Sequence, residues 1–193
     1  MNIAKKTGNE PIMDNSGRKV STVRDYWAWA YSSLIGNTER GRFAEYLVAT
    51  ALGVNHGVRS EWDRYDLKTD SGISVEVKAS GYIQSWKQRE LSKPVFSVKP
   101  TRAWDSETYK YACEAKRQAD VYVFCLHNYE YRDEGLNPLD MNQWDFYVIA
   151  TKKLDEIMPT QKTVTLSKLK RLNAMHCDYD NLKHTIENAI SKR

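Results

Sequence analysis

The sequence predicts a mixed α/β domain in which helices flank a mixed β-sheet. Helical patterns come first and a cluster of short strand-like segments follows them. The apolar run ADVYVFCLH, at 119–127, is then typical of a buried central strand. Helical and strand patterns alternate after that run, which favours a sheet covered by helices.

The N-terminal third is expected to contain a tail and two helices. Residues 1–20 are polar and without periodicity, so we expect a flexible tail. A first helix is expected in STVRDYWAWAYSSL, 21–34. A second helix is expected over 36–53, where Phe43, Leu47 and Ala51 form an apolar stripe.

The ends of that second helix carry their own signals. Asn37 or Thr38 is a suitable cap at its start, and Gly53 is suited to end it.

The remaining elements follow from shorter patterns. Strands are expected at 62–69, 73–80, 94–99, 119–127 and 144–151, and helices at 106–118, 151–157, 167–173 and 178–191. Ser106 is the expected cap of the 106–118 helix, and the polar stretch 128–142 is an expected loop. The division that follows is a tail, 1–20, and a single nuclease-like domain, 21–193. Its core covers about 38–150 and a C-terminal helical extension covers 151–193.

Composition places few limits on function. The 193 residues suit one domain, and a net charge of +4 with a pI of about 8.8 is a mild basic bias, compatible with a polyanionic partner. Three cysteines without a CxxC pair suggest neither a disulfide framework nor a zinc ribbon, and favour a reducing compartment. The first residues lack the apolar core of a secretory signal, and no apolar run is long enough to span a bilayer. We therefore expect a cytoplasmic protein that makes no use of a membrane.

The stretch YDLKTDSGISVEVKAS, 65–80, predicts a β-hairpin. Asp70, Ser71 and Gly72 suit a three-residue loop that ends in a left-handed glycine. That loop pairs Leu67 with Val75 and Asp66 with Glu76. Because strand side chains alternate, one face is apolar and the other polar. The polar face holds Asp66, Lys68, Ser74, Glu76, Lys78 and Ser80.

The opposed carboxylates of Asp66 and Glu76 indicate a chemical role. Opposed Cβ atoms lie about 4.5–5.5 Å apart, and two carboxylates at that separation share a proton or a cation. Mg²⁺ accepts one or two carboxylates together with waters and a phosphate. Lys78 projects from the same face, where it stabilises charge on a phosphate oxygen or helps to deprotonate the attacking water. The pattern therefore predicts phosphodiester hydrolysis.

An acidic residue, a hairpin and then E-x-K, after a helix that carries a glutamate, resembles the PD-(D/E)xK, or restriction-endonuclease-like, nuclease superfamily. Glu45, Asp66, Glu76 and Lys78 match, and the resemblance spans roughly 38–126. It implies an α-β-β-β-α-β core with flanking helices. It also implies that Asp66 and Glu76 bind Mg²⁺, with Mn²⁺ as a substitute. Lys78 would then assist the attacking water and Glu45 would tune or extend the metal site, and cleavage would leave 5′-phosphate and 3′-hydroxyl ends.

Three nearby positions qualify the resemblance. Tyr65 stands where the family has proline. Gln84 is a candidate auxiliary catalytic residue facing the phosphodiester. Gln88 occupies the place of the tyrosine in the Q-x-x-x-Y pattern of the exonuclease-like branch, so an endonuclease is favoured over a processive exonuclease.

Several alternatives remain open on the sequence alone. E-x-K is a weak motif, and it recurs as Glu114 and Lys116 within the expected 106–118 helix. The polar hairpin face is alternatively a solvent-exposed surface. An RNase or toxin nuclease on the same scaffold, or a catalytically inactive nucleic-acid-binding module, is the alternative to a DNA endonuclease of the restriction, phage-defence or repair type.

Basic residues near tryptophans are candidate nucleic-acid contacts. These are Lys68, Lys87, Arg89 and Arg102, with Trp86 and Trp104 nearby. The alternative is that the tryptophans belong to the hydrophobic core and the basic residues lie at its solvent-exposed edge. For Lys68, the alternative is that it protects a sheet edge from aggregation. The expected partner is nucleic acid, with DNA favoured. A homodimer is possible because double-strand cleavage needs two sites.

Overall fold

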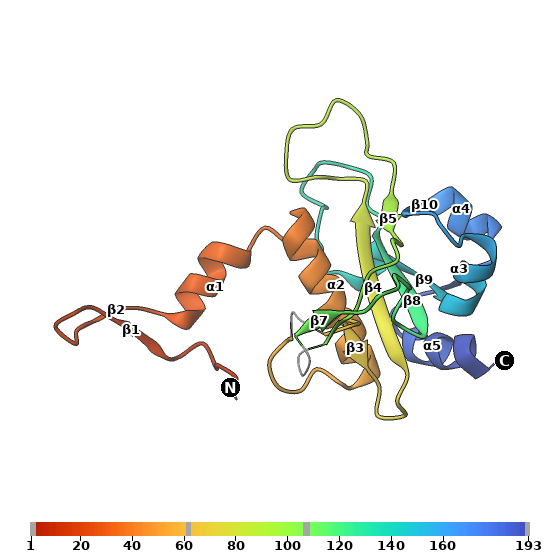
Figure 1. Cartoon of the computed structure of the whole chain (residues 1–193). Coiled ribbons are helices and arrows are strands. Elements are labelled where there is room, and N and C mark those ends of the chain that lie inside the picture. The colour runs from red at the N-terminus through yellow and green to blue at the C-terminus, as the bar shows by residue number, and fades with distance from the viewer. Residues whose placement is uncertain (1–2, 61–62, 106–108, 192–193) are drawn as a thin grey trace.

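The computed structural model describes residues 3–60, 63–105 and 109–191 and confirms the mixed α/β class (Figure 1). A five-stranded mixed sheet has the order β11-β9-β8-β4-β3. Its strands are β3 (Leu67–Lys68), β4 (Ser74–Gly81), β8 (Val121–His127), β9 (Trp144–Ala150) and β11 (Met175–Cys177). The pair β4 and β8 is parallel, and the other pairs are antiparallel.

The N-terminal residues form an arm that extends away from the sheet (Figure 1). A hairpin of β1 (Pro11–Met13) and β2 (Lys19–Thr22) precedes α1 (Val23–Tyr31). Thr22 and Asp25 close the start of α1 with a reciprocal capping box. The first expected helix is therefore confirmed. The lack of periodicity in 1–20 did not predict the hairpin, which is set by a turn from Asp14 to Arg18.

The second expected helix, α2 (Asn37–Leu52), is also confirmed and covers one face of the sheet. It ends at Gly53, whose φ of 77° is left-handed. Its start differs from the prediction, because Gly36 is the N-cap and no side chain caps the helix.

Two apolar clusters lie on opposite faces of the sheet. On the first face, α2 and α5 (Leu182–Ser191) pack on β4, β8 and β9 through Leu47, Val77, Val123, Phe146 and Ile186. On the second face lie α3 (Thr151–Ile157), α4 (Leu166–Arg171) and a small sheet of β5 (Val95–Ser97) with β10 (Thr163–Thr165). The expected strand 119–127 is confirmed as the centre, because every residue of β8 is buried.

Two expectations about the core were wrong. In the described part of the expected 106–118 helix, β7 (Lys110–Tyr111) instead pairs with β6 (Trp104–Asp105). The strand at 94–99 forms, but β5 pairs with β10 outside the main sheet. Of the expected α-β-β-β-α-β core, the structure therefore has the first helix (α2), the first two strands (β3 and β4) and the last strand (β8) in and on the main sheet. The third strand and the second helix of that core are not there among the residues that the structure describes. Ser106 lies outside the described residues.

The C-terminal third follows its patterns more closely. The helices expected at 151–157, 167–173 and 178–191 correspond to α3, α4 and α5, and 128–142 is a loop that ends in the 3₁₀ turn η1 (Met141–Gln143). The short strands β10 and β11 were not predicted. In the part of the chain that is described, no helix is long and apolar enough to cross a membrane.

Candidate active site

The predicted hairpin forms in the predicted register. Leu67 pairs with Val75 and Lys68 with Ser74. The backbone N–H of Thr69 donates to the Ile73 carbonyl at 2.9 Å, and Gly72 has the left-handed φ of 89° that the loop requires. Asp66 lies one residue before this ladder and therefore reaches the level of Glu76 and Val77 on β4.

The Asp66 carboxylate is fixed by the backbone of β4. Its Oδ2 accepts a hydrogen bond from the Val77 N–H at 2.7 Å. Burial, and then the negative charge of Glu76, raise the pKa of Asp66 to about 6, against the opposing effects of Lys78 and of this hydrogen bond. Glu45 contributes in the same direction as Glu76. The structure thus brings Asp66 within electrostatic reach of Glu45, Glu76 and Lys78.

Glu76 and Lys78 form an ion pair on the second face of β4. Lys78 Nζ lies 2.6 Å from Glu76 Oε1, and their side chains are 29% and 18% exposed. Burial opposes the charged form of Lys78, but Glu76 and Asp66 outweigh it and raise the Lys78 pKa. The pair is half-buried because Tyr122 and Phe124 stand beside it on β8. This position is not the freely solvated surface of the alternative interpretation.

Glu45 reaches the same region from α2. Arg59 donates from Nε and Nη2 to both Glu45 oxygens, which fixes the carboxylate. Glu45 and Asp66 line one hollow of about 370 Å³, together with Asp63 and Lys68. The glutamate that the resemblance matched on the helix therefore lies beside Asp66.

The donor set fits a magnesium ion that keeps most of its own waters. Asp66 and Glu76 supply two carboxylates, and Mg²⁺ is bound in proteins by one or two carboxylates with waters and substrate phosphate. Within the described ranges, no three His, Cys, Asp or Glu side chains are grouped closely enough to form a complete metal cage. Glu45 is bonded to Arg59, so its part in holding a metal stays a prediction.

Gln84 was predicted to face this site, but the structure places it elsewhere. It is buried in the loop that follows β4, where Nε2 donates to the Gly81 carbonyl at 2.9 Å and Oε1 accepts from Arg40 at 3.3 Å. Arg40 also donates to the carbonyls of Ile35 and Ile83. These bonds make Gln84 part of a structural network that joins α2 to β4. Arg40 is a charged residue among the buried, otherwise apolar side chains of α2, such as Ala44 and Leu47.

The four predicted nucleic-acid contacts lie in different places. Lys68 lines the hollow beside Asp66. Arg102 lines a smaller hollow that also includes Asp63 and Trp104. Lys87 and Arg89 are exposed in the loop after β4, beyond its Gly81 end, so the structure does not group them with Lys68.

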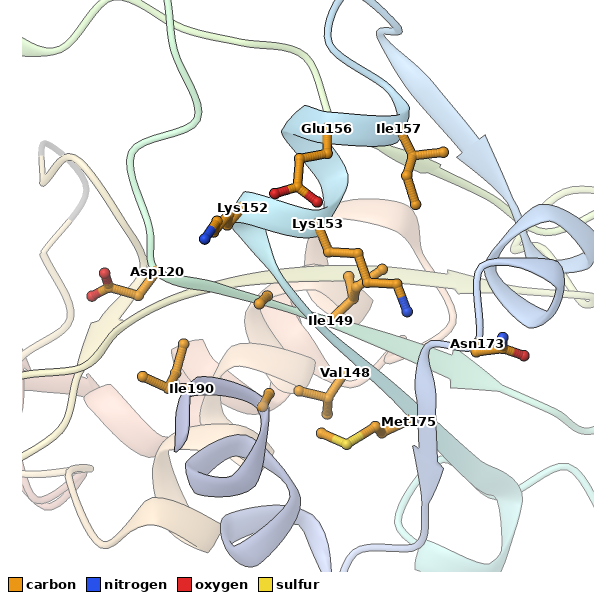
Figure 2. Close-up of a pocket in the computed structure, with 12 residues that line it drawn as sticks. Asp120, Val148, Ile149, Lys152, Lys153, Glu156, Ile157, Asn173, Met175 and Ile190 are labelled. Carbon is orange, nitrogen blue, oxygen red and sulfur yellow. The ribbon is translucent and has the colours of Figure 1, made fainter. Parts of the chain in front are cut away.

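A separate cavity of about 540 Å³ lies between β9, α3 and α5 (Figure 2). Figure 2 shows Val148, Ile149 and Met175 between α3, which carries Lys152 and Lys153, and Ile190 of α5. Its walls combine apolar side chains with charges of both signs. Asp66, Glu76 and Lys78 are absent from this lining.

No model of a known protein family matches the chain, and no curated protein sequence matches it either. The family resemblance remains a hypothesis based on four matched positions.

Proposed function

We propose that this protein is a Mg²⁺-dependent endonuclease that hydrolyses phosphodiester bonds, with DNA as the favoured substrate and Mn²⁺ as a substitute metal. One observation carries the proposal. Glu76 and Lys78 form a half-buried ion pair, and Asp66 lies within electrostatic reach of both, so that the two carboxylates repel each other. Such an arrangement costs stability unless a cation or a substrate uses it.

Each side chain has a distinct part in the proposed reaction. Asp66 and Glu76 hold the metal, and the Val77 N–H keeps the Asp66 carboxylate oriented toward it. Bound Mg²⁺ would polarise the phosphodiester and orient the attacking water. Lys78 is held charged by its acidic neighbours, so it is suited to stabilise negative charge on a phosphate oxygen. Arg59 fixes Glu45 at the edge of the site.

The local architecture supports the family resemblance, whereas the wider fold departs from it. A helix bearing Glu45, the hairpin β3–β4 and the parallel neighbour β8 occur in the expected order. The third strand and second helix of the expected core are replaced by β5 and the β6–β7 hairpin. The restriction-endonuclease-like assignment of the whole fold is accordingly part of this proposal.

Digestion of parallel substrates tests the proposal. Supercoiled plasmid, linear duplex, single-stranded DNA and structured RNA would be incubated with the protein in Mg²⁺, in Mn²⁺ and in EDTA. We expect nicking of the plasmid in either metal and none in EDTA, because the carboxylates need a cation to engage phosphate. Cleavage of RNA alone would replace the DNA endonuclease with an RNase on the same scaffold. Stable binding without cleavage would indicate an inactive nucleic-acid-binding module.

A further inference from the structure

Three aromatic side chains cluster on the β6–β7 hairpin. The rings of Trp104 and Tyr111 lie edge to face with centroids 4.9 Å apart, and Tyr109 meets Trp104 at 6.4 Å. Tyr109 and Tyr111 remain 78% and 62% exposed. These rings are held in place by one another while much of their surface is left open to a ligand.

The hairpin has a fixed base on the body of the protein. Thr101 and Lys116 exchange two backbone hydrogen bonds of 3.0 Å, and Ala112 N–H donates to the Ala103 carbonyl at 2.8 Å. Next to this base, the buried Arg117 donates to the carbonyls of Val98 and Met158 and to Asp155. Binding to a surface held in this way requires little ordering of the protein.

Cations lie beside Trp104 and Tyr111 of the aromatic cluster. Two small hollows, of about 230 and 160 Å³, share Tyr111 and are lined by four basic side chains, Arg64, Arg102, Lys110 and Lys116. Asp63 is the acidic residue among the described lining residues, and Glu114 of the same segment lines neither hollow. Exposed rings beside an excess of positive charge are complementary to a nucleic-acid strand, which offers base faces and phosphates.

This surface is continuous with the proposed active site. Asp63 lines both the hollow beside Trp104 and the hollow that contains Glu45 and Asp66. Asp66 comes three positions after Asp63, which places their Cα atoms within about 11 Å of each other. That distance corresponds to about three stacked nucleotides.

We propose that the β6–β7 hairpin binds an unpaired nucleotide of a single-stranded DNA segment next to the scissile bond. Bases stack on Tyr111 and Tyr109, and Arg64 and Arg102 contact the adjacent phosphates. A duplex offers its base faces to neighbouring bases, so the rings select single-stranded or unpaired DNA. This substrate class rests on the proposed nuclease function of the neighbouring carboxylates.

Fluorescence anisotropy in EDTA tests the inference without cleavage. Labelled oligo-dT and a duplex of equal length would be titrated with wild type, Tyr111→Ala, Tyr111→Phe and Tyr131→Ala. Tyr131 is a matched control, because it is 67% exposed and packs edge to face with Tyr129 in the 128–140 loop. We expect wild type to prefer the single strand, and Tyr111→Ala to bind it about tenfold more weakly or worse. Tyr111→Phe and Tyr131→Ala should bind as wild type does.

The outcomes separate this inference from the nuclease proposal. Equal binding of oligo-dT by Tyr111→Ala and wild type, or wild-type preference for duplex, overturns the role of the hairpin even if the protein nicks plasmid. Loss of single-strand binding in Tyr111→Ala supports the hairpin even if wild type cleaves nothing in Mg²⁺. Thermal unfolding of each variant identifies a change in fold, which Tyr111→Phe is designed to avoid.

Discussion

Glu76→Gln is expected to abolish Mg²⁺-dependent nicking of supercoiled plasmid, with a rate reduced by about a hundredfold or more. The substitution keeps the side-chain volume but removes one of the two carboxylates that we propose hold the metal. A bound metal would contribute several kcal/mol of charge stabilisation. It also removes the ionic partner of Lys78, 2.6 Å away. The initial nicking rate at saturating Mg²⁺ is the measurement.

Glu187→Gln is the matched control for this variant. Glu187 is an exposed glutamate on α5. Its substitution by glutamine is the same chemical change, at a position far along the chain from the hairpin. We expect it to nick plasmid at the wild-type rate. Nicking by Glu76→Gln within a few-fold of this control would show that Glu76 has no part in the reaction.

Asp66→Asn is expected to lose nuclease activity and to gain stability. The Asp66 pKa is raised to about 6 by burial and by Glu76, so ionisation of this carboxyl opposes folding. Below the pKa of Asp66 in the unfolded chain, about 4, the carboxyl is protonated and does not oppose folding. As pH rises through about 6, it ionises in the folded protein, and the free energy of unfolding falls by on the order of 2–3 kcal/mol. Asparagine carries no charge at either pH and retains an oxygen to accept from the Val77 N–H.

Urea unfolding in EDTA at pH 4 and pH 7.5 measures this effect. The free energy of unfolding of Asp66→Asn should exceed that of wild type at pH 7.5, and the excess should shrink at pH 4. If Asp66→Asn is less stable than wild type at both pH values, burial and the charge of Glu76 do not destabilise the ionised Asp66 carboxylate. Nicking assays on the same samples report the accompanying loss of activity.

The parts of the site that follow from local chemistry could be predicted from the sequence. The Asp70–Gly72 loop fixes the register of the hairpin, and that register places Asp66 beside Glu76. Likewise, the apolar stripe of α2 and the apolar run of β8 determined their elements because burial follows periodicity. The environment of Glu45 was not predictable, since Arg59 reaches it from a segment without regular structure.

The errors occur where tertiary contacts override local preference. The stretch 109–118 has helix-forming residues, yet Arg117 is buried and bonded to distant carbonyls, and the stretch is not helical. Gln84 looked like a polar residue near the site, but the buried Arg40 requires its oxygen. A lone polar residue in sequence does not reveal which buried partner it satisfies.

Calorimetric titration of Mg²⁺ into wild type and Glu76→Gln, alone and with a short DNA that has both duplex and single-stranded segments, tests the central claim most directly. We predict binding to wild type that strengthens with DNA, because a phosphate supplies further oxygen ligands. Binding to Glu76→Gln should be lost or greatly weakened under the same conditions. If wild type binds no Mg²⁺ even with DNA present, the carboxylates of the β3–β4 hairpin do not form a nuclease site.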